Sequence, residues 1–292
     1  MKFTCERSYL SDALGLARRA VSSRNTLPIL SHILLETQDD RLRLTATDLD
    51  TAIRCAVPAS VVENGSVAVP AASLSDYVSK LPDAPITLEF KSGTLQLRCG
   101  PSKFKVPNAP GGDFPDVPEV SQGTEICVPA STLKEMLRLS TFAASKDETR
   151  GLLTGVLFQA RGNVLTLVAT DTHRLAWNQA QIPTTSSVPV SAVVPAKPLV
   201  ELERILKSSE DEIVTVRFGS AQVQFQGNDA TLVARLVDGQ FPDHERIIPK
   251  LTARNVTFDR KALLQAMRRV EIVSSTASNK VIVNFSSAVM SM

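Results

Sequence analysis

Hydrophobic residues recur along this chain in two different rhythms. Between residues 7 and 21, Leu10, Leu14, Ala17 and Val21 follow one another at intervals of 4, 3 and 4, which places them on one face of an amphipathic helix. Four other stretches alternate apolar and polar residues with the period of two that is typical of a half-buried strand. These stretches are residues 41–45, 94–98, 164–168 and 214–218. The pattern therefore predicts helices combined with antiparallel strands, an α+β fold.

The helical rhythm returns further along the chain. One stretch offers Leu133, Met136, Leu137 and Ser140 as a buried face, and another offers Leu263, Leu264, Met267 and Val270. A different helix is predicted after Pro70-Ala71 and again after Pro195-Ala196, because proline is well tolerated at a helix start. In the second of these helices the apolar side consists of Leu199, Leu202, Ile205 and Leu206.

These elements belong to a long internal repeat. The order Phe3, Ala46-Thr47-Asp48, Val69-Pro70-Ala71 and Phe114-Pro115-Asp116 returns as Ile126, Ala169-Thr170-Asp171, Val194-Pro195-Ala196 and Phe241-Pro242-Asp243. A third opening begins at Val256. The repeat is far longer than a solenoid unit, so each copy is expected to be a domain. The predicted domains are residues 1–122, 123–251 and an incomplete 252–292.

Composition is that of a soluble globular protein. Of the 292 residues, 43% are hydrophobic and 21% charged, and the start of the chain lacks the apolar core of a signal peptide. No run approaches the length of a membrane span. Cys5, Cys55, Cys99 and Cys127 lack metal-ligand spacing, which favours reduced, mostly buried thiols and a cytoplasmic protein over a disulfide or metal role.

Charge is distributed unevenly. The helical segments 7–24, 72–80, 131–146, 197–207 and 260–270 together carry a net charge of +10, so the rest of the chain carries −8 against a total of +2. One interpretation is that these are ordinary solvated helix faces. The alternative is that repeated domains line up their helices around one polyanion, since scattered Lys and Arg without aromatic residues suit phosphate contact without reading of bases.

The two complete copies differ after their shared aspartates. Asp48 and Asp171 occupy equivalent positions, which favours a structural role in a turn. Only the second copy continues with Thr172-His173-Arg174-Leu175, and only it follows Phe-Pro-Asp with His244-Glu245-Arg246. No nucleophile elbow, zinc-protease motif or glycine-rich phosphate loop is present. We therefore expect no catalytic residue, no metal and no cofactor, and interpret His173 as an ordinary surface or core histidine.

In combination, these residues resemble the bacterial β sliding clamps, the processivity subunits of DNA polymerase III. The resemblance runs from Met1 to Met292 and rests on motifs in order. These are Met1-Lys2-Phe3, Thr26-Leu27-Pro28-Ile29-Leu30, Thr45-Ala46-Thr47-Asp48, residues 168–175 and residues 236–243. Clamps of this family have three copies of one domain, with two helices of each copy on the inner face of a ring and antiparallel sheets outside. The resemblance thus implies a non-enzymatic protein that encircles duplex DNA through phosphate contacts and tethers its partners.

The resemblance also implies three sets of site residues. The partner-peptide pocket would consist of Leu153, Thr170, Thr172, His173, Arg174, Leu175, Pro242, Arg246 and Ile247. DNA contacts would fall on Arg24 and Lys197, with Arg150, Lys146 and Arg138 as further candidates. Some clamps carry aromatic residues after the arginine equivalent to Arg150, whereas Gly151 and Leu152 follow it here. A head-to-tail dimer would use Phe104 on one side and Ile272 and Val273 on the other.

The partners implied are duplex DNA, the DNA polymerase III α subunit, the clamp loader, other proteins with a clamp-binding motif and a second copy of the chain; no membrane is implied. Relative to the family, the third copy stops early, before the residues that form the last wall of the pocket. The first hypothesis is therefore a clamp that works by raising effective concentration at the template. The second is a truncated, monomeric open-ring module that binds partner peptides without encircling DNA. A third is an enzyme using Asp171, His173 and Arg246.

Overall fold

The computed structural model describes residues 1–21, 27–117, 119–209, 211–248, 256–274, 281–285 and 290–291. The chain divides into two compact units, Met1–Pro242 and Asp243–Met292. The first unit contains both complete copies of the repeat. The boundary predicted between residues 251 and 252 lies outside the described residues.

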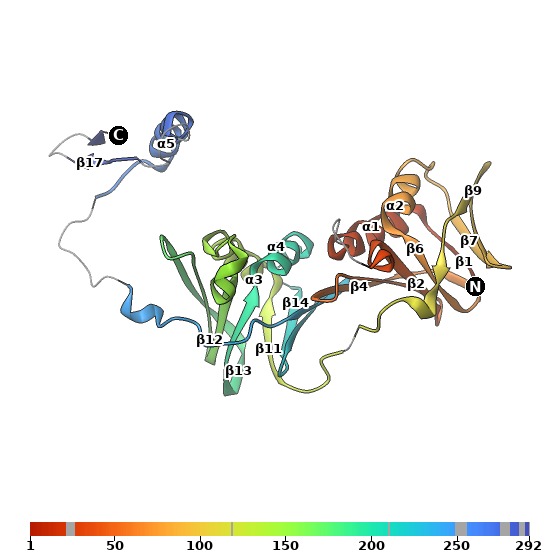
Figure 1. Cartoon of the computed structure of the whole chain (residues 1–292), viewed down its shortest axis with the longest axis horizontal. Helices are drawn as coiled ribbons and strands as arrows, with labels where there is room; N and C mark the ends of the chain where they lie inside the picture. The colour runs from red at the N-terminus through yellow and green to blue at the C-terminus, as the bar shows by residue number, and fades with distance from the viewer. Residues whose placement is uncertain are drawn as a thin grey trace. The chain divides into compact units, whose positions relative to one another are not determined.

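Both copies contribute to one antiparallel sheet of nine strands (Figure 1). Its order is β10 (Ala109–Pro110), β6 (Gly65–Pro70), β2 (His32–Gln38), β3 (Arg41–Thr47), β4 (Thr51–Pro58), β16 (Ala230–Arg235), β15 (Gln222–Gln226), β14 (Ile213–Phe218) and β11 (Thr124–Pro129). The copies meet where β4 pairs with β16, with Ile53 opposite Leu232. Both of these side chains are buried, so the joint between the copies is part of the hydrophobic core.

The remaining strands of the first unit form two smaller sheets. One has the order β5 (Ser60–Glu63), β1 (Lys2–Cys5), β7 (Ile86–Lys91), β8 (Thr94–Cys99) and β9 (Ser102–Val106). The other pairs β12 (Gly155–Thr170) with β13 (Leu175–Pro195). The alternating runs at 41–45, 94–98, 164–168 and 214–218 lie in β3, β8, β12 and β14, which confirms the four strands predicted from their period.

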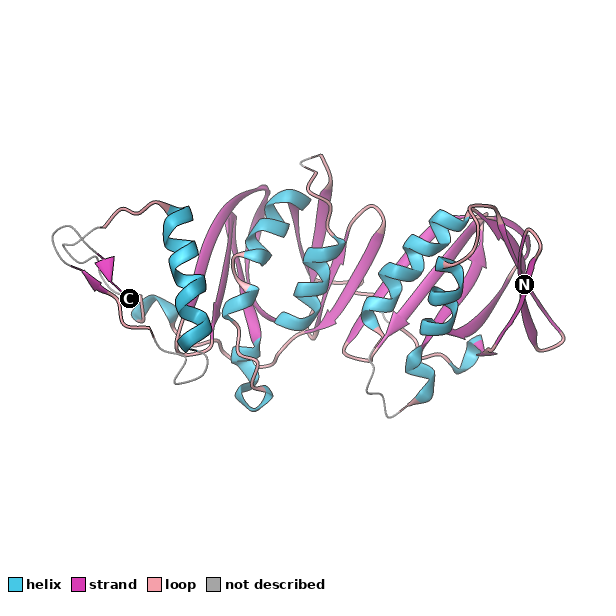
Figure 2. Cartoon of the chain, turned by 90° about the horizontal axis from the view of Figure 1, so that it is seen from above, coloured by secondary structure: helices cyan, strands magenta, loops and turns pink. Residues whose placement is uncertain are grey.

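Four helices cover one face of these sheets (Figures 1 and 2). They are α1 (Arg7–Ala17), α2 (Ala71–Ser79), α3 (Ala130–Arg138) and α4 (Ala196–Ile205). The 3-10 turns between elements are η1 (Arg18–Ala20), η2 (Pro28–Ser31), η3 (Gly111–Asp113), η4 (Thr141–Ala143) and η5 (Glu148–Thr154). The predicted apolar faces are buried, with Leu10 and Leu14 on α1 and Leu133 and Leu137 on α3. Burial of each such side chain contributes about 1.5–3 kcal/mol.

All four cysteines lie in strands. Cys5, Cys55 and Cys99 are buried, and Cys127 is partly buried. Burial, reinforced by the nearby carboxylates of Glu6 and Asp229 respectively, raises the pKa of the Cys5 and Cys55 thiols to about 12. These two thiols are therefore protonated and unreactive in the folded protein.

The second unit contains η6 (His244–Arg246), α5 (Arg260–Ser274) and the strand pair β17 (Asn284–Phe285) and β18 (Met290–Ser291). The helix predicted in the third copy is present as α5. The prediction that Leu263, Leu264, Met267 and Val270 form a buried face is wrong, because Leu264 and Met267 are exposed and no residue of α5 is fully buried. Within the described part of this unit, the only sheet is the short β17–β18 pair, which leaves little apolar surface for the helix to pack on.

Candidate functional site

The turn after β12 is built around Asp171. Its Oδ1 accepts hydrogen bonds from the backbone amides of His173 and Arg174, each at 3.0 Å. Thr170 Oγ1 accepts from the Thr172 amide at 3.1 Å and donates to the Arg174 carbonyl at 2.7 Å. Thr172 has a backbone φ of 79°, a value that residues other than glycine rarely adopt. The structural role predicted for Asp171 is confirmed, since its carboxylate holds the turn together.

The same turn occurs after β3 in the first copy. Asp48 Oδ1 accepts from the amides of Asp50 and Thr51 at 3.2 and 2.7 Å, and Thr47 Oγ1 accepts from the Leu49 amide at 3.0 Å. Leu49 has the same φ, 79°, as Thr172. The equivalence of Asp48 and Asp171 therefore extends to their hydrogen bonds and backbone angles.

Electrostatics reinforce the turn of the second copy. Although partial desolvation acts to raise it, the amides of His173 and Arg174 and the Arg174 guanidinium lower the pKa of the Asp171 carboxyl below its ordinary value. Arg174 Nε lies 3.0 Å from Asp171 Oδ2, and its guanidinium lies over the Phe142 ring at 5.5 Å from the centroid. Phe142 is an exposed residue that the sequence analysis did not single out, and its contact fixes the orientation of Arg174.

Arg150 is fastened to the same turn. Its Nη1 donates to the Asp171 carbonyl and to Thr172 Oγ1, each at 3.0 Å, and its Nε lies 3.5 Å from Asp147 Oδ2. The side chain and amide of Thr149 lower the pKa of Asp147, so this carboxylate is charged opposite Arg150 at neutral pH. Arg150 was predicted as a DNA contact, and the structure places its guanidinium at the wall of the predicted pocket.

A small hydrophobic cluster lies beside the turn. Its buried members are Leu157, Val168, Val193 and Phe241, and Leu152, Leu175 and Val237 pack against it. Of these, the sequence analysis selected only Leu175. Leu153 lies on η5 next to Leu152, and its carbonyl accepts from the Ser145 amide at 2.8 Å. Pro242 directly follows the cluster residue Phe241, whose buried position gives the repeated Phe-Pro-Asp motif a packing role.

The last two predicted pocket residues lie on the other compact unit. Arg246 Nε lies 2.8 Å from Asp243 Oδ2, and both the Arg246 and Ile247 side chains are exposed. Leu153, Thr170, Thr172, His173, Arg174, Leu175 and Pro242 lie on the first unit. The structure joins Thr170, Thr172 and Arg174 in one turn, with Leu175 in the adjacent cluster.

The predicted DNA-contact residues are exposed or lie outside the described residues. Lys197 is 80% exposed at the start of α4, with its Nζ 3.4 Å from Asp48 Oδ2. Arg138 lies 3.8 Å from Glu135 on α3. Lys146 is exposed and makes no ion pair with the residues that the structure describes. Arg24 lies outside the described residues.

Several basic side chains on the helical face have a carboxylate partner. Arg18 pairs with Asp76, and Arg19 and Arg204 both pair with Glu201. Lys207 pairs with Asp229. Exposed ion pairs of this kind contribute only about 0–1 kcal/mol, so a phosphate can replace the carboxylate at small cost.

The predicted contact residues of a dimer occupy separate elements. Phe104 lies on β9, at the end of the five-stranded sheet, and its ring stacks on Tyr77 of α2 with 4.2 Å between centroids. Ile272 and Val273 lie in the last turn of α5 and are both 72% exposed.

Neither a metal centre nor a membrane segment is found in the part of the chain that the structure describes. No three His, Cys, Asp or Glu side chains gather there to hold a metal ion. No described helix has the length and apolar character needed to cross a membrane.

Two family models match the chain. The N-terminal domain of the DNA polymerase III beta subunit matches residues 1–118, and the central domain of the same subunit matches residues 127–243. The beta sliding clamp of Synechocystis sp. is 36% identical over 302 residues, which cover 96% of this chain and 77% of that protein. The beta sliding clamp of Bacillus subtilis is 31% identical over 291 residues, which cover 97% and 77%.

Solved structures agree with these relatives. The DNA polymerase sliding clamp from Bacillus subtilis superposes with a TM-score of 0.93 at 29% identity, over 99% of this chain and 79% of that one. A DNA polymerase III subunit beta from Pseudomonas aeruginosa, bound to griselimycin, superposes with a TM-score of 0.88 at 33% identity, over 93% and 74%.

Repeated α+β domains that share one sheet and carry their helices on one face define a protein of the DNA-clamp class. Relatives of this class match the chain over nearly its whole length. The chain belongs to the β sliding clamp family, the β subunits of DNA polymerase III. The Asp171 carboxylate, which the enzyme hypothesis would use, accepts two backbone hydrogen bonds within its own turn.

Proposed function

We propose that this protein is a non-catalytic processivity factor that encircles duplex DNA and tethers the replicative polymerase to it. The observation that carries the proposal is the placement of α1 to α4 on one face of the sheets that the two copies share. The basic side chains of this face can exchange their carboxylate partners for phosphates. Such contacts suit sliding along DNA of any base sequence. We place the protein in the cytoplasm, associated with the nucleoid.

For DNA contact we propose Arg24, Lys197, Lys146 and Arg138. Each is a long cationic side chain on or beside the helical segments, and the exposed Lys197 has a single ion-pair partner among the described residues, the largely buried carboxylate of Asp48. Arg150 already has two partners in the Asp171 turn and a third in Asp147, so we assign it to the wall of the partner pocket. DNA binding should therefore weaken with rising salt as neutralised phosphates release their counterions.

For partner binding we propose the pocket on the second copy. Its residues are Leu153, Thr170, Thr172, His173, Arg174, Leu175, Pro242, Arg246 and Ile247. Apolar side chains rimmed by a histidine and arginines suit a short peptide with hydrophobic anchors. The partners would be the polymerase α subunit, the clamp loader and other proteins that carry a clamp-binding motif. Arg246→Ala and Leu175→Ala should each weaken peptide binding, and unchanged affinity in both variants would refute the assignment.

For assembly we propose domains at 1–122, 123–251 and 252–292 and a head-to-tail pairing through Phe104, Ile272 and Val273. In the second copy, the strand equivalent to β9 is β16, which pairs with β4 of the neighbouring copy. Among the described strands, β9 is the last of its sheet and has one free edge. This edge is therefore suited to pair with a strand of another protomer that is equivalent to β4.

The test of the central proposal compares two forms of one DNA. The protein is loaded by its clamp loader onto a nicked circular duplex, and half of the sample is then cut with a restriction enzyme. Gel filtration should show protein retained on the circle and lost from the linear form, because a ring slides off a free end. Equal retention on both forms would refute topological binding.

A further inference from the structure

A second groove lies where the first copy meets the second. It has a volume of about 430 Å³ and lies between the turn after β3, the linker that follows the first copy and the β14–β15 hairpin. Leu49, Glu119, Val120, Gln122, Gln222 and Arg235 are among the residues that line it. No part of the proposed function uses this groove.

The groove is the first-copy counterpart of the proposed partner pocket. Leu49 corresponds to Thr172, with the same φ and the same hydrogen-bonded turn. Phe114 and Phe241 lie 127 positions apart, and the same offset relates Glu119 to Arg246 and Val120 to Ile247. Leu49, Glu119 and Val120 line the groove here, and the residues at the same positions of the second copy are those named for the proposed partner pocket.

Leu49 is the unusual residue in this groove. A leucine at positive φ is unfavourable, and this one also leaves 58% of its side chain exposed. Strained residues of this kind persist where the surroundings hold them, and they cluster at ligand-binding sites. The hydrogen bonds of the Asp48 turn hold the backbone here, so an apolar side chain is presented at the mouth of the groove beside the buried Val120.

The uncompensated charge of the groove is positive. Glu119 is paired with Arg54, whose Nη1 lies 2.7 Å from Glu119 Oε1. Arg235 is exposed, and its guanidinium makes no ion pair with the described residues, while its backbone amide donates to the Asp50 carbonyl at 2.8 Å. The backbone contact fixes Arg235 beside the turn and leaves its charge available to a carboxylate.

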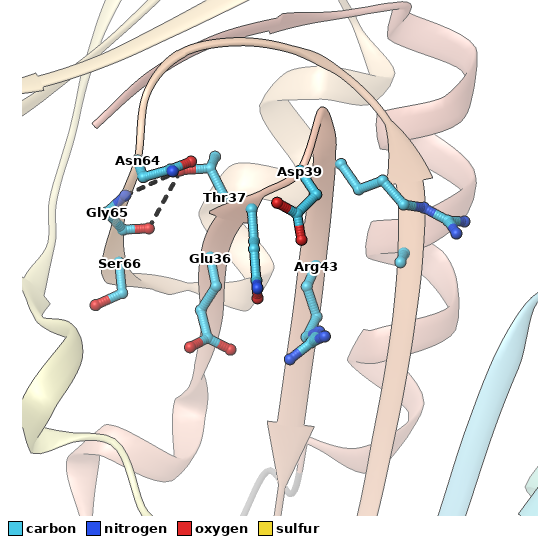
Figure 3. A pocket seen from close by; sticks show the side chains of 10 residues that line it. Glu36, Thr37, Asp39, Arg43, Asn64, Gly65 and Ser66 are labelled. Atoms are coloured by element: carbon cyan, nitrogen blue, oxygen red, sulfur yellow. Dashed lines mark hydrogen bonds between the residues drawn. The ribbon is translucent and has the colours of Figure 1, made fainter.

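A larger cavity, lined by residues of β2, β3, β4 and β6 and the loops beside them, provides a contrast with this groove (Figure 3). It has a volume of about 590 Å³, and Glu36, Asp39, Arg41 and Arg43 line it together with smaller polar residues. Its only apolar side chain is that of Ala56. Charges of both signs without a large apolar residue give a peptide no anchor, whereas the groove at Leu49 offers both an anchor and a single charge.

We propose that the groove at Leu49 is a second peptide-binding site. It would take an extended segment of a partner protein that places an apolar side chain against Leu49 and Val120 and a carboxylate against Arg235. The inference rests on the proposed function in one respect, namely that the equivalent pocket of the second copy binds peptides. The clamp would then hold one partner at two separate sites. Binding at one site raises the effective concentration of the partner at the other.

The experiment is a site-resolved NMR titration of the full chain with acetyl-Gly-Asp-Leu-Ser-Leu-Gly-amide and with its matched Lys-for-Asp version. The acidic peptide should shift the amide signals of Leu49, Gln122 and Gln222. Arg235→Glu should weaken acidic-peptide binding at these signals about three-fold or more and strengthen binding of the Lys peptide, since the charge is reversed.

Two further variants serve as controls. One tests the groove without disturbing the fold, and the other tests whether the signals arise from the pocket of the second copy. Leu49→Gly should remove the response while keeping the fold, because glycine adopts positive φ without strain. Leu175→Ala should weaken binding in the second-copy pocket and leave the shifts at the groove unchanged. Shifts confined to that pocket, or groove affinities unchanged by Arg235→Glu, would overturn the second site and leave the proposed function standing. Failure of the proposed function would instead appear as equal retention on circular and linear DNA.

Discussion

Arg150 Nη1 donates a hydrogen bond to Thr172 Oγ1 at 3.0 Å and thereby links the η5 turn to the strained turn at the end of β12. The same nitrogen donates to the Asp171 carbonyl. A residue whose position in sequence suggested DNA contact thus holds the Asp171 turn, whose residues belong to the proposed partner pocket. The hydrogen bonds of the Asp171 turn hold Thr172 at positive φ, as those of the Asp48 turn hold Leu49, and Arg150 adds a further contact to Thr172.

Replacement of Arg150 should therefore affect peptides more than DNA. We expect Arg150→Ala to weaken partner-peptide binding by roughly two- to five-fold, the range for loss of an exposed charged contact, and to leave the salt dependence of DNA binding unchanged. Fluorescence anisotropy with a labelled partner peptide and with duplex DNA measures both. If the variant instead reduced the slope of log DNA affinity against log salt and left peptide affinity intact, Arg150 would be a DNA contact.

The Asp171 turn should resist acid. The lowered pKa of Asp171 means that the turn gains stability from the charged carboxylate above the ordinary pKa of 3.8 and loses it as the pH falls through the lowered folded value. We expect a carbon-detected NMR titration to place the Asp171 midpoint below 3.8. Asp171→Asn should remove this pH dependence of the His173 and Arg174 amide signals. A midpoint at or above 3.8 would contradict the hydrogen bonding described.

The joint between the copies should be essential for stability. Ile53 is fully buried where β4 meets β16, so Ile53→Ala should lower the free energy of unfolding by about 2–5 kcal/mol. Urea denaturation followed by circular dichroism measures this change. Val62→Ala, at a strongly exposed strand position, serves as the control and should change stability by about 0.5 kcal/mol or less. Similar effects of both substitutions would argue against a shared core at the joint.

Lys197 should contribute one counterion to DNA binding. Lys197→Ala is expected to reduce the slope of log affinity against log salt by about 0.9. The matched control is Lys103→Ala, an exposed lysine on β9 rather than on the helical face. The slope is measured by anisotropy between low and physiological salt. Equal effects of the two variants would show that the helical face is not the DNA-binding face.

Much of the fold could be predicted from the residues themselves. The period of the apolar positions located α1, α3 and α4, and the alternating runs located β3, β8, β12 and β14. These predictions succeeded because helix and strand each impose a local spacing on the side chains they bury. The face of α5 was mispredicted, since burial depends on a covering partner that periodicity does not supply.

The pocket was predicted less completely. Sequence comparison of the two copies identified Asp171 and Leu175, because those positions combine a repeated motif with a local difference. The contact of Phe142 with Arg174 and the packing of Leu152 and Val237 beside Leu175 were not predicted, since each of these residues comes from a separate element. Arg150 was predicted as a DNA contact, and its hydrogen bonds to the Asp171 turn were not predicted.

The sequence by itself determined the repeat, the helices, four of the strands, the uneven charge and the family, since all of these depend on residues near one another in the chain or on motifs in order. Only the tertiary structure decided that β4 and β16 join the copies, that Arg150 supports the Asp171 turn and that Leu49 opens onto a second groove. These facts depend on contacts between residues far apart in sequence, such as Arg150 with Thr172 and Arg235 with Asp50. No local spacing encodes such contacts, because they arise only when packing brings separate elements together.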